Sequence, residues 1–338
     1  MKPPAVTVLM TMFNAARHLR AAIDSILRQT FADFEFLIID DGSTDDSAEI
    51  VSTYRDDRIR LIHNAANQGQ TPCLNQGLEL ARGAWIARQD ADDLAHPRRL
   101  ERQIAKLRAD ETLALLGAQA WIVDEWGRFS GMLTVPTEAE SIGWAMLFEN
   151  PFIHTAAIFR RDVAQSLGGY DAAFRICQDY DLWLRIKTGH RAANLPDRLV
   201  TYRHSPTSLQ HASRDVVRAE SENVVRRAWT AAFAERQPTR TEIEQLLQFR
   251  AGIAPESVAA FREFYASMLA AYLRGQRSLS PHDLRRTVAL HQAKIGRDVA
   301  SLDRAKAAAC FTRTFAEHPA VLTRLALERL AGPFLVQR

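Results

Sequence analysis

The stretch F-E-F-L-I-I-D-D-G-S-T-D, residues 34–45, joins a strand-sized apolar run to a turn rich in aspartate. Phe34 to Ile39 predicts a buried strand, and Ser43 with Asp46 has the spacing of a capping box for the next helix. The same order of apolar run, polar turn and helical pattern occurs four times in the first half of the chain. This alternation predicts an α/β fold, with a mostly parallel sheet covered by helices on both faces.

The other strands and helices are predicted in the same way, from short apolar runs for strands and from helical spacing of apolar residues for helices. In the first half, strands are expected at 6–10, 59–63 and 85–89, and helices at 16–29, at 71–81 and from Pro97 onward. In the second half, strands are expected at 113–123, 153–159 and 199–202, a hairpin arm at 129–136 and a helix at 179–188.

Composition excludes several classes of protein. The 338 residues are 47% hydrophobic and 25% charged, which is ordinary for a globular chain. A net charge of +3 gives no reason to expect nucleic acid as a partner. Cys73, Cys177 and Cys310 have no metal-ligand spacing and fit a reducing compartment. Without a signal-peptide pattern or an apolar run of about 18 residues, we expect a cytoplasmic protein, or one peripheral at the inner face of the cell membrane.

The character of the chain changes near Ser213, where amphipathic helical patterns replace the alternation. We therefore expect a catalytic domain over residues 1–212 and an all-α domain over residues 213–338. The last helical pattern sets Arg324 and Arg329 among apolar residues. Two uses stay open for it, namely peripheral contact with an anionic membrane and packing against the catalytic domain or a second subunit in a homodimer.

The fourth strand runs directly into Asp90-Ala91-Asp92-Asp93, a D-x-D pattern. Ligands of open α/β sheets bind at the carboxyl ends of the strands, where these carboxylates would repel a phosphate unless a cation stands between them. Mg²⁺ and Mn²⁺ prefer oxygen ligands, so Asp92 could hold such an ion against a diphosphate. The alternative is a turn whose aspartates cap the following helix.

A second group of polar residues is expected at the same edge. Asp41 ends the second strand, which we expect to lie next to the fourth, and Thr11 and Phe13 end the first strand at the same edge. A nucleotide base could stack on Phe13 and bond to Asp41, while Asp90 reaches the ribose hydroxyls. The alternative for Phe13 is ordinary core packing.

Together these residues resemble the family 2 glycosyltransferases of the Rossmann-like GT-A fold. The resemblance covers about the first 210 residues and rests on ordered motifs, which are V-T-V-L-M-T-M-F-N at 6–14, S-I-L-R-Q-T-F-A-D-F-E-F-L-I-I-D-D-G-S-T-D at 25–45, N-Q-G at 67–69, L-N-Q-G-L at 74–78, G-A-W-I-A-R-Q-D-A-D-D at 83–93 and Q-D-Y-D-L-W-L-R at 178–185.

The resemblance implies a role for each matched residue on the donor side. Thr11, Phe13 and Asp41 would hold the base of a nucleotide-diphosphate sugar, Asp90 its ribose, and Asp92 the Mn²⁺ or Mg²⁺. The matched motifs add Asn14, Asn67 and Gly69 to the donor-binding set.

The resemblance also implies the chemistry. The family inverts the anomeric centre, so Asp179 would be the general base that takes the proton of the acceptor hydroxyl. Burial beside Tyr180, Leu182 and Trp183 would move its pKa toward neutrality. The alternative for Asp179 is a helix N-cap, which is compatible with catalysis.

Three departures from the family pattern bear on the site. Gln178 stands where the family usually has Glu before the base. Residues 73–77 lack the family's arginine, so a diphosphate contact would have to come from elsewhere, with Arg88 and Arg203 as candidates. His204 stands one place earlier than the family's histidine.

The remaining candidates belong to the acceptor side or support the site. His154 matches a family position near the cleft, although a lone histidine is more often structural. Trp183 and Arg185 would flank the acceptor, and Trp183 could equally be core. The full supporting set is Asp93, His154, Gln178, Asp181, Trp183 and Arg185.

The sequence therefore predicts an inverting, metal-dependent hexosyltransferase that uses a nucleotide sugar, UDP-linked by preference, and a saccharide or lipid-linked acceptor. Assembly of a cell-envelope polysaccharide is the setting that the resemblance suggests. One alternative is a non-catalytic sugar-nucleotide sensor or scaffold, for which Gln178 gives some support. Another is a sugar nucleotidyltransferase, but that class needs a glycine-rich loop, and residues 11–17 contain no glycine.

Overall fold

The computed structural model describes residues 2–137, 139–204, 214–233, 239 and 272. Contacts divide the chain into two compact units. The first contains Met1–Thr137 and Asn150–Glu220, and the second contains Glu138–Glu149 and Ser221–Arg338. Every residue of the candidate site lies in the first unit, and the two units are described separately.

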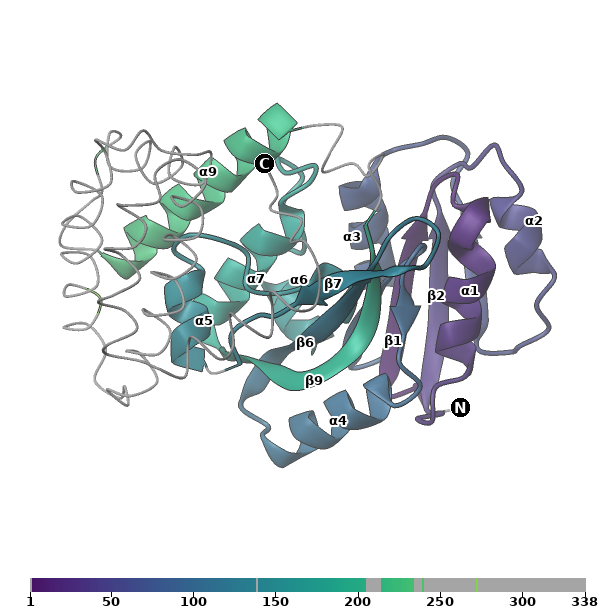
Figure 1. Ribbon diagram of the computed structural model, residues 1–338, viewed down its shortest axis with the longest axis horizontal. Helices are drawn as coiled ribbons and strands as arrows, with labels where there is room; N and C mark the ends of the chain where they lie inside the picture. Colours follow the sequence, from purple (N-terminus) through teal and green to yellow (C-terminus); the bar gives the residue numbers. More distant parts are fainter. Residues whose placement is uncertain (1, 138, 205–213, 234–238, 240–271, 273–338) are drawn as a thin grey trace. The chain divides into compact units, whose positions relative to one another are not determined.

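The first unit is built on one mixed sheet, which confirms the predicted α/β fold. Its strand order is β3-β2-β1-β4-β8-β6-β9-β5, with β7 paired to β6 (Figure 1). The strands are β1 Val6–Met12, β2 Phe34–Asp40, β3 Ile59–His63, β4 Trp85–Asp90, β5 Leu94–Ala95, β6 Leu113–Val123, β7 Phe129–Leu133, β8 Ile158–Arg160 and β9 Arg191–Arg203. The first four strands are mutually parallel, β6 and β9 form one more parallel pair, and the remaining pairs are antiparallel.

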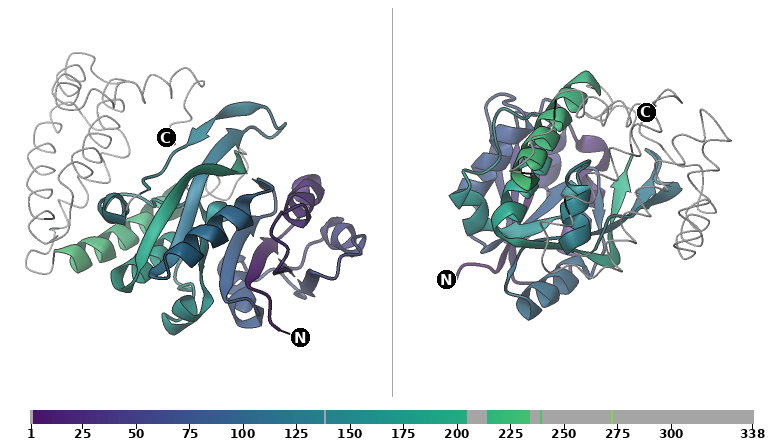
Figure 2. Two further views of the ribbon diagram at one scale, coloured as in Figure 1. Left: turned by 90° about the horizontal axis from the view of Figure 1, so that it is seen from below. Right: turned by 90° about the vertical axis from the view of Figure 1, so that its left-hand side faces the viewer.

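Helices cover both faces of this sheet. They are α1 Ala16–Leu27, α2 Ser47–Ser52, α3 Gln70–Leu80, α4 Arg99–Ala109, α6 Arg161–Ser166 and α7 Gln178–Gly189. The first turns of α9 Arg214–Ala232 also belong to this unit. On one face, Val6, Val8 and Met10 share a core with apolar residues of α1 and α4. On the other, Gly77 of α3 lies directly against the side chain of Leu9, where a larger residue would clash. β9 pairs with β6 toward one end of the sheet, and the views in Figure 2 show it as a long, curved strand.

The register of β1 sets the geometry of the site. Thr11 pairs with Ile39 of β2 on one side and with Asp90 of β4 on the other, and Met12 pairs with Asp40. The acidic ends of β2 and β4 therefore lie at the same sheet edge, as expected. The expectation that these two strands are neighbours was wrong, because β1 lies between them.

Two local predictions were wrong. The helix after β2 begins at Ser47 without a side-chain cap, and the Ser43 hydroxyl instead accepts a hydrogen bond from the backbone N–H of Asn14 at 3.0 Å. The apolar run at 153–159 is not one strand, since it forms the 3-10 turn His154–Ala156 followed by β8.

The second unit is described only in part. It contains α5 Ala139–Ala145 and the later turns of α9, and its aromatic side chains Trp144, Phe148 and Trp229 pack edge to face. The predictions about Arg324 and Arg329 lie outside the described residues, and the division at 212 stays a prediction. Among the described residues, the helices are too short or too polar to span a bilayer.

Candidate active site

The acidic loop after β4 forms the centre of the site. Asp90 ends the strand, and its carboxylate accepts a hydrogen bond from Nη2 of Arg88 at 2.6 Å. Its backbone N–H donates to the Thr155 hydroxyl at 3.1 Å. Asp93 is buried, and one of its carboxylate oxygens accepts the backbone N–H of Arg203 at 2.7 Å. The loop is therefore fixed from both sides, with Asp92 between two anchored aspartates.

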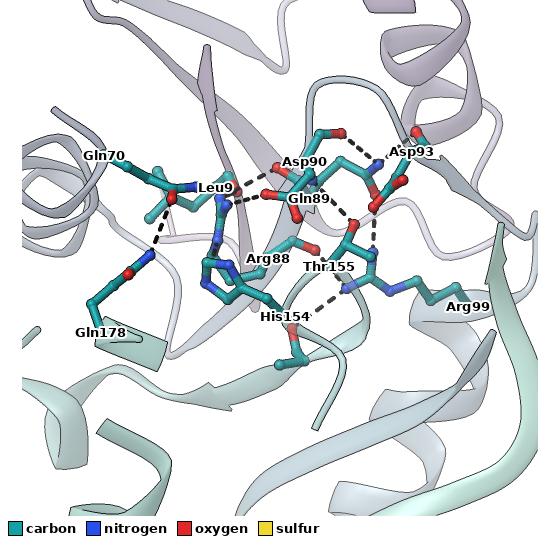
Figure 3. A network of polar contacts seen from close by, with 11 residues as sticks. Leu9, Gln70, Arg88, Gln89, Asp90, Asp93, Arg99, His154, Thr155 and Gln178 are labelled. Atoms are coloured by element: carbon teal, nitrogen blue, oxygen red, sulfur yellow. Dashed lines mark hydrogen bonds and ion pairs between the residues drawn. The ribbon is translucent and has the colours of Figure 1, made fainter. Parts of the chain in front are cut away.

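Arg88 supports this loop from inside the sheet (Figure 3). Its guanidinium is fully buried and donates to the Leu9 carbonyl, to Asp90 and to Nε2 of His154. The suggestion that Arg88 contacts a diphosphate is wrong, because these contacts hold it behind Asp90. Burial, with the Arg88 charge next, lowers the pKa of His154 well below its usual range. His154 therefore accepts the hydrogen bond from Arg88 as a neutral ring. This is the structural role that the sequence left open as the alternative to a place in the cleft.

Arg203 joins the same loop to a neighbouring hairpin. Its Nε donates to the Asp92 carbonyl at 3.0 Å, and its Nη1 donates to the Asp124 carbonyl at 3.1 Å. Arg203 thus fixes the backbone around Asp92. Its contact with a diphosphate stays a prediction.

The electrostatics of the loop favour a bound cation. Burial, and then the negative charge of Asp90, raise the pKa of Asp92 from its ordinary 3.8 to about 6. Burial and the two neighbouring aspartates raise the pKa of Asp93 as well. A divalent ion would relieve this repulsion. Among the described residues, no group of three or more His, Cys, Asp or Glu side chains is placed so that it could hold a metal ion.

The end of β1 presents an aromatic surface beside this loop. Phe13 is 48% exposed, so the alternative of core packing is wrong. Asn14, which follows it, has a positive φ of 49° and accepts the backbone N–H of Thr44 at 2.9 Å. A strained, non-glycine conformation held by cross-loop bonds fixes the direction of the chain at Phe13.

Asp41 shapes the turn before α3. Its carboxylate accepts the backbone N–H groups of Gln68 at 2.9 Å and Gly69 at 2.8 Å. Burial favours a higher pKa for Asp41, but these bonds outweigh it and lower the pKa below the usual value. Asp41 is therefore ionised and brings the N-Q-G turn, with its exposed Asn67, to the sheet edge.

Asp179 lies on the first turn of α7. The N-cap position belongs to Cys177, so the interpretation of Asp179 as the N-cap is wrong. One oxygen of Asp179 accepts Nδ2 of Asn150 at 2.9 Å, and the other accepts the N–H of Tyr180 at 2.7 Å. Burial raises the pKa of Asp179 from 3.8 to about 7, against the opposing effect of these two bonds. A carboxylate with a near-neutral pKa suits general-base catalysis.

The carboxylates gather in one region. The pKa of Tyr202 on β9 is raised by burial and then by the negative charges of Asp93, Asp90, Asp92 and Asp179. The Tyr202 hydroxyl is therefore close enough to all four carboxylates for their charges to raise its pKa. The charge of Asp90 also raises the pKa of Asp179. The D-x-D loop and the first turn of α7 therefore belong to a single acidic site.

The rest of α7 has a supporting role. Trp183 is fully buried, with its ring centroid 5.0 Å from that of Phe159, so its proposed place beside an acceptor is wrong. Arg185 pairs with the buried Asp181 at 2.7 Å and donates to nearby carbonyls. Gln178 is buried and donates to the side chain of Gln70 at 3.1 Å, which joins the starts of α7 and α3 (Figure 3).

Two residues of this site have no signal in the sequence. Asn150 holds Asp179 from a segment 29 residues away. The carboxylate of Glu220, on α9, accepts the backbone N–H groups of Arg175, Ile176 and Cys177, each at 2.9 Å. An anionic group at this helix end is favoured by the helix dipole and fixes the start of α7.

Comparison with known proteins defines the class. The family model described as Glycosyl transferase family 2 matches residues 7–168. The putative glycosyltransferase EpsE of Bacillus subtilis is 36% identical over 216 residues, 62% of this chain and 77% of that relative. This chain belongs to the family 2 glycosyltransferases, as the motifs predicted.

A further relative agrees with this assignment, and two solved structures share the fold. The amylovoran biosynthesis glycosyltransferase AmsE of Erwinia amylovora is 32% identical over 58% of this chain and 75% of its own length. The fold is similar to S. aureus TarS 1–349 in complex with UDP-GlcNAc, with a TM-score of 0.56, 16% identity and coverage of 93% and 91%. It is also similar to the mannosyltransferase PcManGT from Pyrobaculum calidifontis in complex with GDP-Man and Mn2+, with a TM-score of 0.53, 19% identity and coverage of 97% and 85%.

Proposed function

We propose that this glycosyltransferase is an inverting, metal-assisted enzyme. It moves a hexosyl group from a nucleotide-diphosphate sugar, a UDP-sugar by preference, to a hydroxyl of a saccharide or lipid-linked acceptor. The observation that carries the proposal is the near-neutral pKa of the buried Asp179 beside the D-x-D loop.

The donor would lie along the edge formed by β1, β2 and β4. Phe13 offers an exposed ring for stacking with the base, and Thr11 lies next to it at the strand end. The ionised Asp41 and the turn that it holds would line the base, and Asp90 would accept hydrogen bonds from the ribose. Asp90 can do so because Arg88 holds its carboxylate in place from behind.

The acidic loop would hold the cation, and Asp92 is its proposed ligand. Burial, and then repulsion by the Asp90 carboxylate, raise its pKa, and a cation would offset both effects, so this residue fits a Mg²⁺ or Mn²⁺ ion. When bound, the ion would neutralise the charge of the diphosphate leaving group. The PcManGT complex, which contains Mn2+ together with GDP-Man, supports this choice.

Asp179 would take the proton from the acceptor hydroxyl. Its carboxylate is held by Asn150 and by the N–H of Tyr180, so one orientation is favoured before any acceptor arrives. At neutral pH about half of the molecules would carry the ionised base, given a pKa near 7.

The setting is proposed from the relatives. The name of AmsE refers to amylovoran biosynthesis, which supports assembly of a cell-envelope polysaccharide for this chain. Such a role would suit a cytoplasmic enzyme with peripheral contact at the inner membrane face. Homodimer formation through the C-terminal helices stays a prediction.

A thermal-shift screen of UDP- and GDP-sugars with and without Mn²⁺ tests the donor and the metal together. A donor at 100 times its dissociation constant stabilises the folded state by about 2.7 kcal/mol. We expect stabilisation that needs Mn²⁺ and is lost in Asp92→Asn. The matched control is Asp162→Asn, whose exposed aspartate on α6 should be dispensable. Equal stabilisation of Asp92→Asn and wild type would contradict the metal assignment.

An assay of nucleotide release separates the enzyme from a sensor. An enzyme releases the nucleotide when donor and acceptor are both present, and the release depends on Asp179. Tight donor binding without turnover against any acceptor pool would instead favour a non-catalytic sugar-nucleotide sensor.

A further inference from the structure

The hairpin of β6 and β7 carries an exposed aromatic surface. Among the described residues, the large apolar side chains left exposed are Phe13 and three on this hairpin, namely Trp121 at 41%, Trp126 at 66% and Phe129 at 54%. The rings of Trp121 and Phe129 lie edge to face, with centroids 5.9 Å apart. Single exposed aromatics are common on protein surfaces, but several on one hairpin are typical of a binding surface.

A cation without a counter-ion lies on this surface. The Arg198 guanidinium is 4.8 Å from the centroid of the Trp121 ring, makes no ion pair with the described residues, and has a buried Nε without a hydrogen-bond partner. Arg128, which lies 4.9 Å from the Trp126 ring centroid, is instead neutralised by Asp124 at 2.7 Å. We call Trp121, Trp126, Phe129 and Arg198 the hairpin face. Its uncompensated charge is the positive charge of Arg198.

The hairpin face is connected to the acidic site. The backbone carbonyl of Asp124, in the turn between β6 and β7, shares the Arg203 guanidinium with the carbonyl of Asp92. Glu125 in the same turn pairs with Arg17 of α1 at 3.1 Å. The Arg203 side chain thus links this turn to the loop of the proposed metal ligand, so a molecule that extends from the hairpin face along the turn would reach the acidic site.

We infer that the hairpin face binds an acidic saccharide unit of the acceptor. Pyranose rings present weakly positive C–H groups that pack well on the negative faces of aromatic rings. The Arg198 guanidinium would bind a sugar carboxylate through charge-assisted hydrogen bonds. This inference rests on the proposed transfer to a saccharide acceptor and specifies its chemical class.

An anionic membrane is the competing occupant for aromatic side chains beside arginine. The charges in the turn argue against it, because the described residues pair Asp124 with Arg128 and Glu125 with Arg17, which neutralises both arginines. A membrane-binding surface would instead gain from several unpaired cations. The single unpaired arginine on the ring fits one carboxylate better than a charged bilayer.

Binding of trigalacturonate, measured by calorimetry and compared with neutral maltotriose, tests the inference. We expect the wild type to bind the acidic trisaccharide more tightly than the neutral one. Arg198→Gln should weaken this binding about tenfold or more, since a charge-assisted bond is lost. Trp126→Ala, at the most exposed ring, should also weaken it. Arg191→Gln, on the same strand, is the matched control and should bind as wild type.

Three results would overturn the inference. They are the absence of trigalacturonate binding by the wild type, equal binding by Arg198→Gln, and Trp126-dependent binding to phosphatidylglycerol vesicles without saccharide binding. Mn²⁺-dependent stabilisation by the donor, measured by thermal shift, serves as a separate readout. It should be unchanged in Arg198→Gln, and its absence in the wild type would instead count against the proposed function.

Discussion

Replacing Asn150 by alanine should shift the pH dependence of the reaction to higher pH. Asn150 donates to one oxygen of Asp179 at 2.9 Å, and this bond favours the ionised carboxylate. Burial has already raised the pKa of Asp179 to about 7, so wild-type activity should fall as the pH drops through 7. The base must be ionised to accept a proton, which gives this direction.

The size of the shift follows from the lost bond. A hydrogen bond to a charged group contributes about 1.5 kcal/mol or more, and one pKa unit corresponds to about 1.4 kcal/mol. The pKa of Asp179 in Asn150→Ala should therefore rise by about one unit. At pH 6, below both midpoints, the rate should fall about tenfold relative to wild type.

The assay is nucleotide release measured as kcat/KM across pH 5.5 to 9, a range of about three and a half units around neutrality. If the substitution only disturbed the local structure, kcat/KM would fall at every pH and the acid limb of the pH profile would stay in place. The reasoning is refuted if the midpoint of Asn150→Ala stays with that of the wild type or moves to lower pH.

Two further substitutions test the supports of the site. Glu220→Ala should lower kcat and leave KM for the donor near the wild-type value, because three hydrogen bonds to the backbone at the start of α7 are lost. Glu220→Gln should recover part of the rate. Steady-state kinetics measure kcat and KM of both variants, and equal kcat values for Glu220→Ala and wild type would contradict this prediction. Gly42→Ala should destabilise the fold by about 1–3 kcal/mol in urea unfolding. Gly42 has a φ of +74°, and a Cβ there would lie 2.8 Å from the backbone carbon of Ala66. Gly189→Ala, which has open space around it, is the control, and equal stability of the two variants would refute the argument.

The first four strands could be predicted because each is a short apolar run bounded by a polar turn. Their bounds differ from the predicted ones by at most two residues, as at β1, where the strand continues to Met12. The apolar run at 153–159 failed because periodicity cannot separate a buried turn from a buried strand. The position of β1 between β2 and β4 is set by packing, and no local pattern reports strand order.

The acidic residues of the site were predictable, but their supports were not. Asp90, Asp92 and Asp179 stand in recognisable motifs at strand and helix ends. Arg88 lies in the same motif, yet only the fold reveals that it faces inward to Asp90 and His154. Glu220 contacts residues more than 40 positions away, a separation at which the sequence carries no signal.

The most direct test of the account is the rate of nucleotide release by Asp179→Asn at saturating donor and acceptor. Amide and carboxyl are nearly equal in size, so the substitution removes the base while keeping the shape of the site. We expect the rate to fall about 10²- to 10⁴-fold, with Mn²⁺-dependent donor binding retained. A rate close to the wild-type value would contradict the assignment of Asp179 as the general base.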